Sequence, residues 1–169
     1  MRVLILGGTG LLGNALLRVL SKKFETIGTR RVSKIRNELN YIFVKNILDN
    51  LHFLSDAKSK IMIEASFGFK ADVLATHRLR NPELGGGAIL DVGCYPLTMA
   101  KLIAGQFQGL AFAEPKSLSA TGQLDKTGVD LQSHAHLIFS DLIEAKISCA
   151  INEDFSNNLV ISSSKGTIT

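Results

Sequence analysis

An aspartate and a tyrosine four residues apart are the side chains in this sequence best suited to chemistry. Asp91 and Tyr95 belong to the apolar segment GGGAILDVGCYPLTMAKLIAG, which runs from Gly85 to Gly105. On a helix, a spacing of four residues places carboxylate and phenol on one face. A phenol in a cleft can donate or relay a proton once its neighbours tune its pKa. The structural alternative is a core helix with a buried tyrosine and an aspartate cap, and the pattern leaves both interpretations open.

The glycines at the start of this segment bear on the same site. Gly85, Gly86 and Gly87 precede an apolar stretch of helical length. Backbone amides at the start of a helix point outward and favour anionic or polar ligands. We therefore predict a long helix that begins at these glycines and carries Asp91 and Tyr95 near its start.

A second glycine-rich motif follows the first apolar run of the chain. Residues 2–7, RVLILG, read as a buried strand, and the glycines after them fit both G-x-G-x-x-G and G-x-x-G-x-x-G ahead of an amphipathic helix. In this strand–turn–helix context, glycines permit the tight turn and let a pyrophosphate approach the backbone. The predicted cofactor-binding residues of this loop are Gly7, Gly8, Thr9, Gly10, Leu11, Leu12 and Gly13.

The end of the next predicted strand, FETIGTR, indicates which nucleotide the loop would take. An NAD-selective site normally has an acidic residue there for the ribose hydroxyls. This chain has Thr29, Arg30 and Arg31 instead. Because guanidinium groups match a 2′-phosphate bidentately, we predict NADP as the preferred cofactor, with NAD possible. The alternative is that the arginines are solvated loop residues.

Composition and charge narrow the function classes. Residues 1–60 hold 11 Lys and Arg against 4 Asp and Glu, whereas residues 61–169 hold 8 against 11. No aromatic interleaving or reading helix accompanies the basic part, so a phosphate-bearing cofactor explains it better than nucleic acid does. No uninterrupted apolar run approaches the roughly 18 residues of a membrane span. Two cysteines form neither a disulfide framework nor a metal site, which favours a cytoplasmic location.

The second part of the chain predicts a different layer architecture. A strand at IMIEASFGF and one long helix are followed by several β-rich runs separated by turn residues. We therefore predict an α/β chain. A truncated Rossmann-like parallel βαβ unit spans residues 1–60, and an α+β domain with an open, mostly antiparallel sheet and one long helix spans residues 61–169.

Two family resemblances divide the chain at the same place, near Lys60. Residues 1–60 resemble extended short-chain dehydrogenase/reductases through GGTGLLG and the strand-end arginines, but Tyr41 and Lys45 lie in a predicted strand where that family has a helical Tyr-x-x-x-Lys. Residues 58–169 resemble the C-terminal domain of the Gfo/Idh/MocA oxidoreductases. The blocks that carry this resemblance are ASFGF, RxxxPELGGGxxxDVGCYP, AEP and TGVD, and the nearest branch is that of glucose-fructose oxidoreductase and dihydrodiol dehydrogenase.

The second resemblance assigns roles. Tyr95 stands at the position of the family's acid/base residue, and Asp91 is the aspartate of the same D-x-G-x-[HY] motif. The resemblance implies an NAD(P)-dependent oxidoreductase acting on a sugar or polyol-like alcohol or carbonyl. The family's lysine in a Glu-Lys-Pro motif has no counterpart here, so activity is expected to be impaired unless Lys101 or Lys70 substitutes.

The alternative is a non-catalytic nucleotide-binding or dimerisation module. In either case the incomplete sheet predicts a homo-oligomer through the open sheet, with no nucleic-acid, membrane or metal partner. His134 and His136 alternate within a predicted strand, where a half-exposed sheet face explains them better than a metal site.

Overall fold

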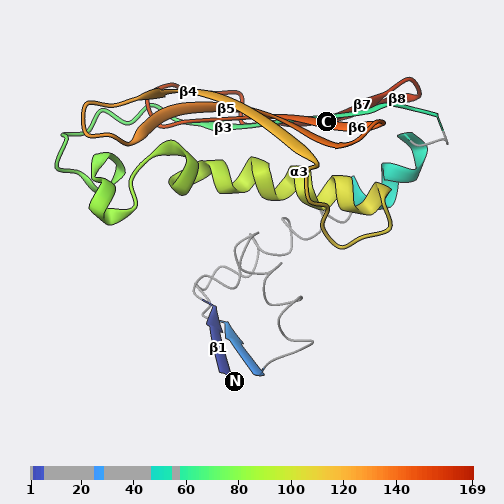
Figure 1. The fold of residues 1–169 in the computed structure, drawn as a ribbon, viewed down its shortest axis with the longest axis horizontal. Coiled ribbons are helices and arrows are strands. Elements are labelled where there is room, and N and C mark those ends of the chain that lie inside the picture. The colour runs from blue at the N-terminus through green and yellow to red at the C-terminus, as the bar shows by residue number, and fades with distance from the viewer. Residues whose placement is uncertain (1, 6–24, 29–46, 55–57) are drawn as a thin grey trace. The chain divides into compact units, whose positions relative to one another are not determined.

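The computed structural model describes residues 2–5, 25–28, 47–54 and 58–169. The chain divides into two compact units, Met1–Asp49 and Asn50–Thr169. Each unit has a sheet of its own, with two strands in the first and six in the second (Figure 1).

The sheet of the first unit is a parallel pair. Strands β1 (Arg2–Ile5) and β2 (Glu25–Gly28) align with Arg2 opposite Glu25 and Ile5 opposite Gly28. The pairing confirms the prediction that the first two strands form a parallel pair. Parallel strands are joined by a crossover connection and not by a hairpin. The predicted strand at residues 41–44 lies outside the described residues.

The sheet of the second unit is open and mostly antiparallel, as predicted. Its order is β4-β5-β6-β3-β7-β8, and only the central β3–β6 pair is parallel. The strands are β3 (Ile61–Gly68), β4 (Ser117–Leu124), β5 (Asp130–Ser140), β6 (Ile143–Ala150), β7 (Leu159–Ser163) and β8 (Gly166–Ile168).

The long helix begins later than the glycines suggested. Two short 3-10 turns, η1 (Arg78–Arg80) and η2 (Pro82–Leu84), precede a π-helical turn, η3 (Ile89–Gly93), which continues into α3 (Cys94–Phe107). Gly85 and Gly87 adopt φ angles of 68° and 112°, outside the right-handed helical region. The three glycines therefore form the turn before the helix, and the prediction that the helix starts at them is corrected.

One face of the six-stranded sheet holds the core of the second unit. Helix α3 lies against β3 and β6, the strands at the centre of the sheet (Figure 1). Side chains alternate along each strand, so that on β6 Ala145 and Cys149 are buried while Lys146 between them is exposed. The largest fully buried side chains are Leu54, Ile63, Ile103, Leu137, Phe139 and Ile161. Burying each one stabilises the fold by about 1.5–3 kcal/mol.

The same core explains why the helical region is so apolar. An 18-residue window within Pro82–Phe107 has a mean hydropathy of 1.3, so this stretch passes the length and composition test for a membrane span. Half of that window is buried inside the unit, where its apolar side chains pack on the sheet. Core packing therefore accounts for the hydropathy.

Candidate functional site

The glycine turn shapes the start of the helix that carries Asp91 and Tyr95. A β-carbon on Gly86 would lie 2.7–2.8 Å from three backbone carbonyl oxygens of the preceding turns. A β-carbon on Gly87 would collide with the carboxylate of Asp130 on β5. That carboxylate accepts hydrogen bonds from the backbone N–H of Ile89, 2.8 Å, and from the Ser133 hydroxyl, 3.0 Å. Asp130 therefore caps the helix from a distant strand, and the glycines leave room for it.

Asp91 forms an ion pair and does not serve as the helix cap. Its Oδ1 accepts a hydrogen bond of 2.6 Å from Nη1 of Arg78 on η1. The Asp91 side chain is 17% exposed and that of Arg78 is 63% exposed. The carboxylate is thus held in one orientation by a partner that solvent can reach.

Tyr95 is partly exposed rather than buried. The residue is 39% exposed, and its ring packs on Phe67 at the end of β3, with ring centroids 5.5 Å apart and planes inclined by 35°. Tilted aromatic pairs of this kind stabilise a ring position by about 0.5–1.5 kcal/mol beyond area burial. The alternative of a buried tyrosine and an aspartate cap is therefore wrong on both counts, because Asp130 provides the cap.

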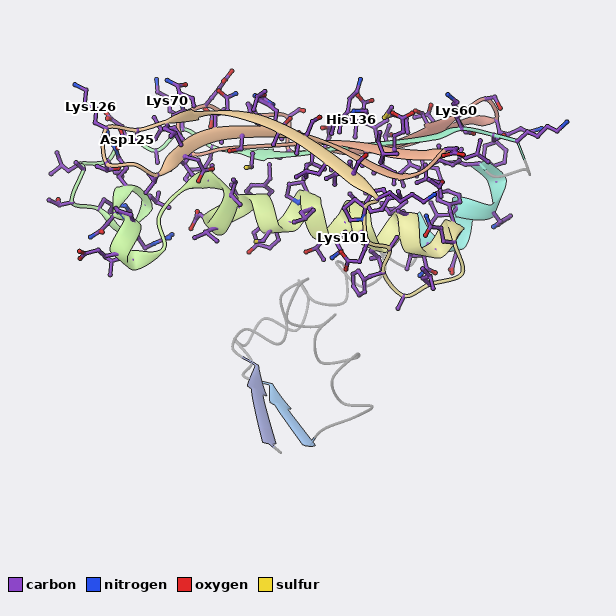
Figure 2. All side chains as sticks on the ribbon, viewed as in Figure 1. Lys60, Lys70, Lys101, Asp125, Lys126 and His136 are labelled. Atoms are coloured by element: carbon purple, nitrogen blue, oxygen red, sulfur yellow. The ribbon has the colours of Figure 1, made fainter. Side chains whose placement is uncertain are left out.

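The contacts of Lys101 and Lys70, the two lysines named as possible substitutes for the family's lysine, do not place either amine next to the Tyr95 phenol. Nζ of Lys101 donates to Oε1 of Glu114 at 2.6 Å, and Lys101 lies six residues beyond Tyr95, about 9 Å further along the helix axis. Lys70 follows β3, where its backbone N–H donates to Oδ1 of Asp154. Figure 2 shows the two lysines in separate parts of the unit. Their substitution for the family's lysine is not supported by these contacts.

A partly buried ion pair, which the sequence did not reveal, anchors the loop that precedes the candidate site in the sequence. Arg80 donates from Nε and Nη2 to the two oxygens of Asp125 at 2.9 and 2.6 Å, and from Nη1 to the Val73 carbonyl at 3.0 Å. Hydrogen bonds from Arg80 and from the Thr127 hydroxyl hold the pKa of Asp125 well below its usual range. Only the turn character of residues 125–128 was visible in the sequence. This bidentate pair joins η1 to the β4–β5 turn.

The two cysteines near the site have environments unsuited to nucleophilic chemistry. Burial raises the pKa of the Cys149 thiol to about 11, and burial also raises the pKa of Cys94. Thiolates are the reactive form, so both side chains stay protonated near neutral pH. They fit the interpretation of small packed residues.

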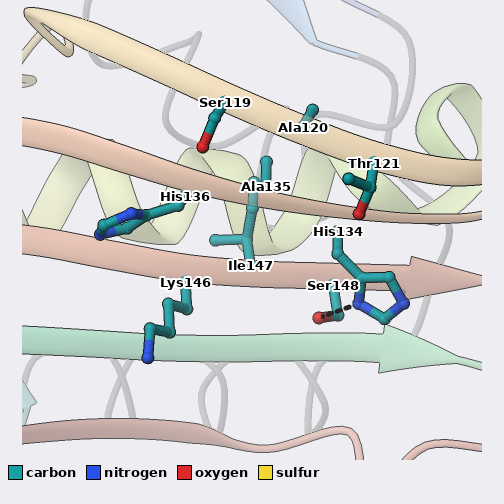
Figure 3. Close-up of a pocket in the computed structure, with 9 residues that line it drawn as sticks. All are labelled: Ser119, Ala120, Thr121, His134, Ala135, His136, Lys146, Ile147 and Ser148. Carbon is teal, nitrogen blue, oxygen red and sulfur yellow. Dashed lines mark hydrogen bonds between the residues drawn. The ribbon is translucent and has the colours of Figure 1, made fainter.

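His134 and His136 lie on the sheet face opposite α3, in a shallow depression of about 350 Å³ (Figure 3). Nδ1 of His134 is 2.8 Å from the Ser148 hydroxyl, and Nε2 of His136 is 2.8 Å from Oε2 of Glu144. The two rings point apart in Figure 3. Within the described ranges no group of three His, Cys, Asp or Glu side chains could hold a metal ion, and the two histidines occupy the expected exposed sheet face.

The predicted cofactor residues lie outside the described part of the chain. They are Gly7, Gly8, Thr9, Gly10, Leu11, Leu12, Gly13, Thr29, Arg30 and Arg31. In the sequence they follow β1 and β2 directly, whose parallel pairing places the carboxyl ends of both strands at one edge. Their role as a nucleotide site remains a prediction.

Comparison with known proteins gives a consistent picture for the second unit. Residues 60–169 match the family model of the GFO/IDH/MocA C-terminal domain. The trans-1,2-dihydrobenzene-1,2-diol dehydrogenase of Xenopus tropicalis is 35% identical over 106 residues, which cover 63% of this chain and 30% of that protein. The enzyme of the same name from Danio rerio is 32% identical over 107 residues, again 30% of its length. The matched stretch is thus under a third of these relatives.

Solved structures extend the likeness in fold. A 3-ketoreductase from Actinomadura kijaniata, in complex with NADP and TDP-benzene, superposes with a TM-score of 0.57 over 96% of this chain and 54% of that one, at 18% identity. An aldose-aldose oxidoreductase from Caulobacter crescentus, complexed with glycerol, gives 0.53 over 73% of this chain and 34% of its own, at 20% identity. At these identities the likeness concerns the fold.

Proposed function

The chain belongs to the Gfo/Idh/MocA family through its C-terminal domain, and we propose that it acts as an NAD(P)-dependent oxidoreductase on a sugar or polyol-like alcohol or carbonyl. The observation that carries this proposal is the position of Tyr95. Its phenol is partly open to solvent, its ring is supported by Phe67, and it follows the Asp91–Arg78 ion pair by one helical turn.

In the proposed reaction Tyr95 handles the proton of the substrate hydroxyl. During oxidation the phenolate form of Tyr95 takes this proton as the alcohol carbon loses a hydride and becomes a carbonyl, and during reduction the phenol returns the proton. Asp91, fixed by Arg78, orients the substrate hydroxyl or the phenol. The nicotinamide cofactor would supply the hydride acceptor or donor.

The two described strands of the first unit are compatible with such a cofactor. A parallel β1–β2 pair is the beginning of a dinucleotide-binding fold, and the glycine loop and Arg30 follow its strands in sequence. We propose that the loop holds the pyrophosphate and that Arg30 and Arg31 favour NADP through its 2′-phosphate. The structures of relatives with bound NADP or NAD support a nicotinamide cofactor in general.

Relatives suggest the chemical class of the substrate. Their names specify a dihydrobenzene diol and an aldose, both of which carry a secondary or hemiacetal alcohol on a ring. The apolar side chains of Leu84, Ile89 and Leu90, exposed to 50–65% near the helix start, suit a ring with a hydrocarbon edge. A cyclic vicinal diol is therefore the first substrate to test.

The proposal is tested by single-turnover hydride transfer. NADPH oxidation or NADP reduction is followed by absorbance with a trans-dihydrodiol, an aldose and a sugar lactone, comparing the natural chain with Tyr95→Phe and Tyr41→Phe. Loss of proton transfer should slow Tyr95→Phe about 10²–10⁴-fold, while Tyr41→Phe keeps its rate. Phenylalanine retains the ring that packs on Phe67, so thermal melting should not change. Equal rates in both variants would refute the role of Tyr95.

A non-catalytic nucleotide-binding or dimerisation module is the second candidate, and experiments on the same purified protein distinguish it from an enzyme. The comparisons do not favour this candidate, which rests only on the missing Glu-Lys-Pro lysine. Cofactor-fluorescence titration with NADPH and NADH would then show binding without turnover. Binding of neither nucleotide below millimolar concentration would refute both candidates.

We also propose that the protein assembles as a homo-oligomer through the six-stranded sheet of its second unit. The sheet face opposite α3 carries exposed polar side chains, and its edge strand β4 is exposed throughout. Light scattering after gel filtration tests this, and a mass of 18.3 kDa would contradict it.

A further inference from the structure

Two arginines on the same 3-10 turn, η1, have different surroundings. All three nitrogens of Arg80 donate hydrogen bonds, Nε and Nη2 to the oxygens of Asp125 and Nη1 to the Val73 carbonyl. Arg78 donates one hydrogen bond, from Nη1 to Oδ1 of Asp91 at 2.6 Å. Its side chain is 63% exposed, against 30% for Arg80. Because a 3-10 helix has three residues per turn, side chains two positions apart leave it on different sides.

The Arg78–Asp91 ion pair leaves hydrogen-bonding groups unused on both side chains. A guanidinium carries five N–H donors in a planar fork, and an ionised carboxylate accepts at two oxygens. Among the described residues, Nε and Nη2 of Arg78 and Oδ2 of Asp91 have no hydrogen-bond partner, and none of these atoms is buried. The pair therefore presents open donors beside an open acceptor, one helical turn before Tyr95 in the sequence.

The backbone fixes η1 against the glycine turn that precedes the helix. The Leu79 carbonyl accepts a hydrogen bond from the Gly87 N–H at 2.9 Å. The Asn81 carbonyl accepts one from the Gly86 N–H, also at 2.9 Å. Leu79 is 4% exposed and belongs to a buried apolar cluster that includes the start of the helix. The backbone beside Arg78 is thus held in place, and the ion pair holds its guanidinium end.

We propose that Arg78 is a specificity-determining residue that recognises the second hydroxyl of a vicinal diol substrate. This inference rests on the proposed oxidoreductase function and deepens it. While the reacting hydroxyl faces Tyr95, the neighbouring hydroxyl donates to Oδ2 of Asp91, and its oxygen accepts from Nε or Nη2 of Arg78. A hydroxyl group has one O–H donor and two acceptor lone pairs, so it can satisfy both open sides of the ion pair at once.

The charges of the pair favour an uncharged substrate group over an anionic one. Asp91 already neutralises Arg78 at 2.6 Å, and its open oxygen repels a carboxylate or phosphate that approaches the same guanidinium. A hydroxyl meets no such repulsion, because it donates to that oxygen. Leu90, directly before Asp91 in the sequence, is 65% exposed and offers an apolar surface for ring carbons. These features fit a neutral cyclic diol.

Two alcohols that differ by one hydroxyl test the role of Arg78. We would measure kcat/KM with NADP for a trans vicinal cyclohexanediol and for cyclohexanol, in the natural chain and in Arg78→Lys. Lysine keeps the positive charge beside Asp91 but loses the planar fork. Because a hydrogen bond to a charged group is lost, the preference for the diol should fall about tenfold. The loss should appear in KM with kcat unchanged, and only for the diol.

Arg80→Gln is the structural control for this measurement. It removes the partner of Asp125 and should lower the melting temperature, while the preference for the diol stays as in the natural chain. Arg78→Lys should keep the melting temperature, because exposed ion pairs add little to stability. A diol preference that falls equally in both variants, or in neither, would overturn the inference.

A binding measurement without chemistry separates this inference from the enzymatic proposal. Saturation-transfer NMR with NADP present gives the affinity of Tyr95→Phe for the diol, with and without Arg78→Lys. Binding about tenfold weaker in Arg78→Lys supports the inference even if the natural chain shows no turnover, a result that refutes the enzymatic proposal alone. Turnover with equal diol affinity in both proteins would overturn the role of Arg78 and leave the enzymatic proposal standing. Tighter, Arg78-dependent binding of the corresponding hydroxy acid, or no binding of the diol, would also overturn the inference.

Discussion

Replacing Gly87 by alanine should damage the candidate site by displacing the carboxylate that caps its helix. Gly87 has φ of 112°, and a β-carbon there would collide with Asp130. Holding a non-glycine residue at such an angle costs about 1–3 kcal/mol. Loss of the Asp130 hydrogen bond to the Ile89 N–H costs about 0.5–2 kcal/mol more. We expect Gly87→Ala to lower the free energy of unfolding by about 1.5–5 kcal/mol.

Gly109→Ala is the matched control for the backbone part of this effect. Gly109 has φ of 70°, and nothing lies within 4 Å of a β-carbon built there. Its substitution should cost about 1–2 kcal/mol from the left-handed conformation alone. The excess in Gly87→Ala therefore measures the collision with Asp130 and the loss of the cap.

Urea denaturation followed by circular dichroism measures these differences. With a slope of about 1–3 kcal/mol/M, a loss of about 1.5–5 kcal/mol moves the midpoint by about 0.5 M or more. Asp130→Ala should cost less in the Gly87→Ala background than in the natural chain, because the cap is already displaced there. Equal costs of Gly87→Ala and Gly109→Ala, or additive effects with Asp130→Ala, would refute this account of the glycine turn.

Two further predictions concern the Arg80–Asp125 ion pair, which joins η1 to the β4–β5 turn, and the buried thiol of Cys149. Asp125→Asn removes the partner of Arg80 and should lower the melting temperature at pH 7. Because the pKa of Asp125 is depressed in the folded state, the stabilisation it provides is present above its unfolded-state pKa of about 4 and is lost as the pH falls. The melting temperature of Asp125→Asn should therefore depend less on pH below about 4 than that of the natural chain. The same pH dependence in both proteins would contradict the role of the Arg80–Asp125 ion pair. Iodoacetamide at pH 8 should modify Cys149, whose pKa is about 11, only after urea is added, and peptide mass spectrometry showing modification in the folded protein would contradict its burial.

The sequence by itself determined the sheet and the identity of the candidate site. Period-2 runs predicted the strands of the second unit, and on β3 and β6 the alternation arises because one face of these strands is buried against α3. The parallel relation of β1 and β2 followed from the strand–turn–helix pattern. Asp91 and Tyr95 were found from their spacing and from the family motif, which are local properties of the chain.

Only the tertiary structure decided what surrounds those two residues. Arg78 pairs with Asp91 across 13 positions, Phe67 supports Tyr95 from β3, and Asp130 reaches the helix start across 41 positions. Such contacts depend on how strands and loops meet in space, and no periodicity records them. The glycines looked like the beginning of a helix because sequence does not show φ angles. Their positive φ and the space they leave for Asp130 make them the turn that places the helix, and with it the phenol.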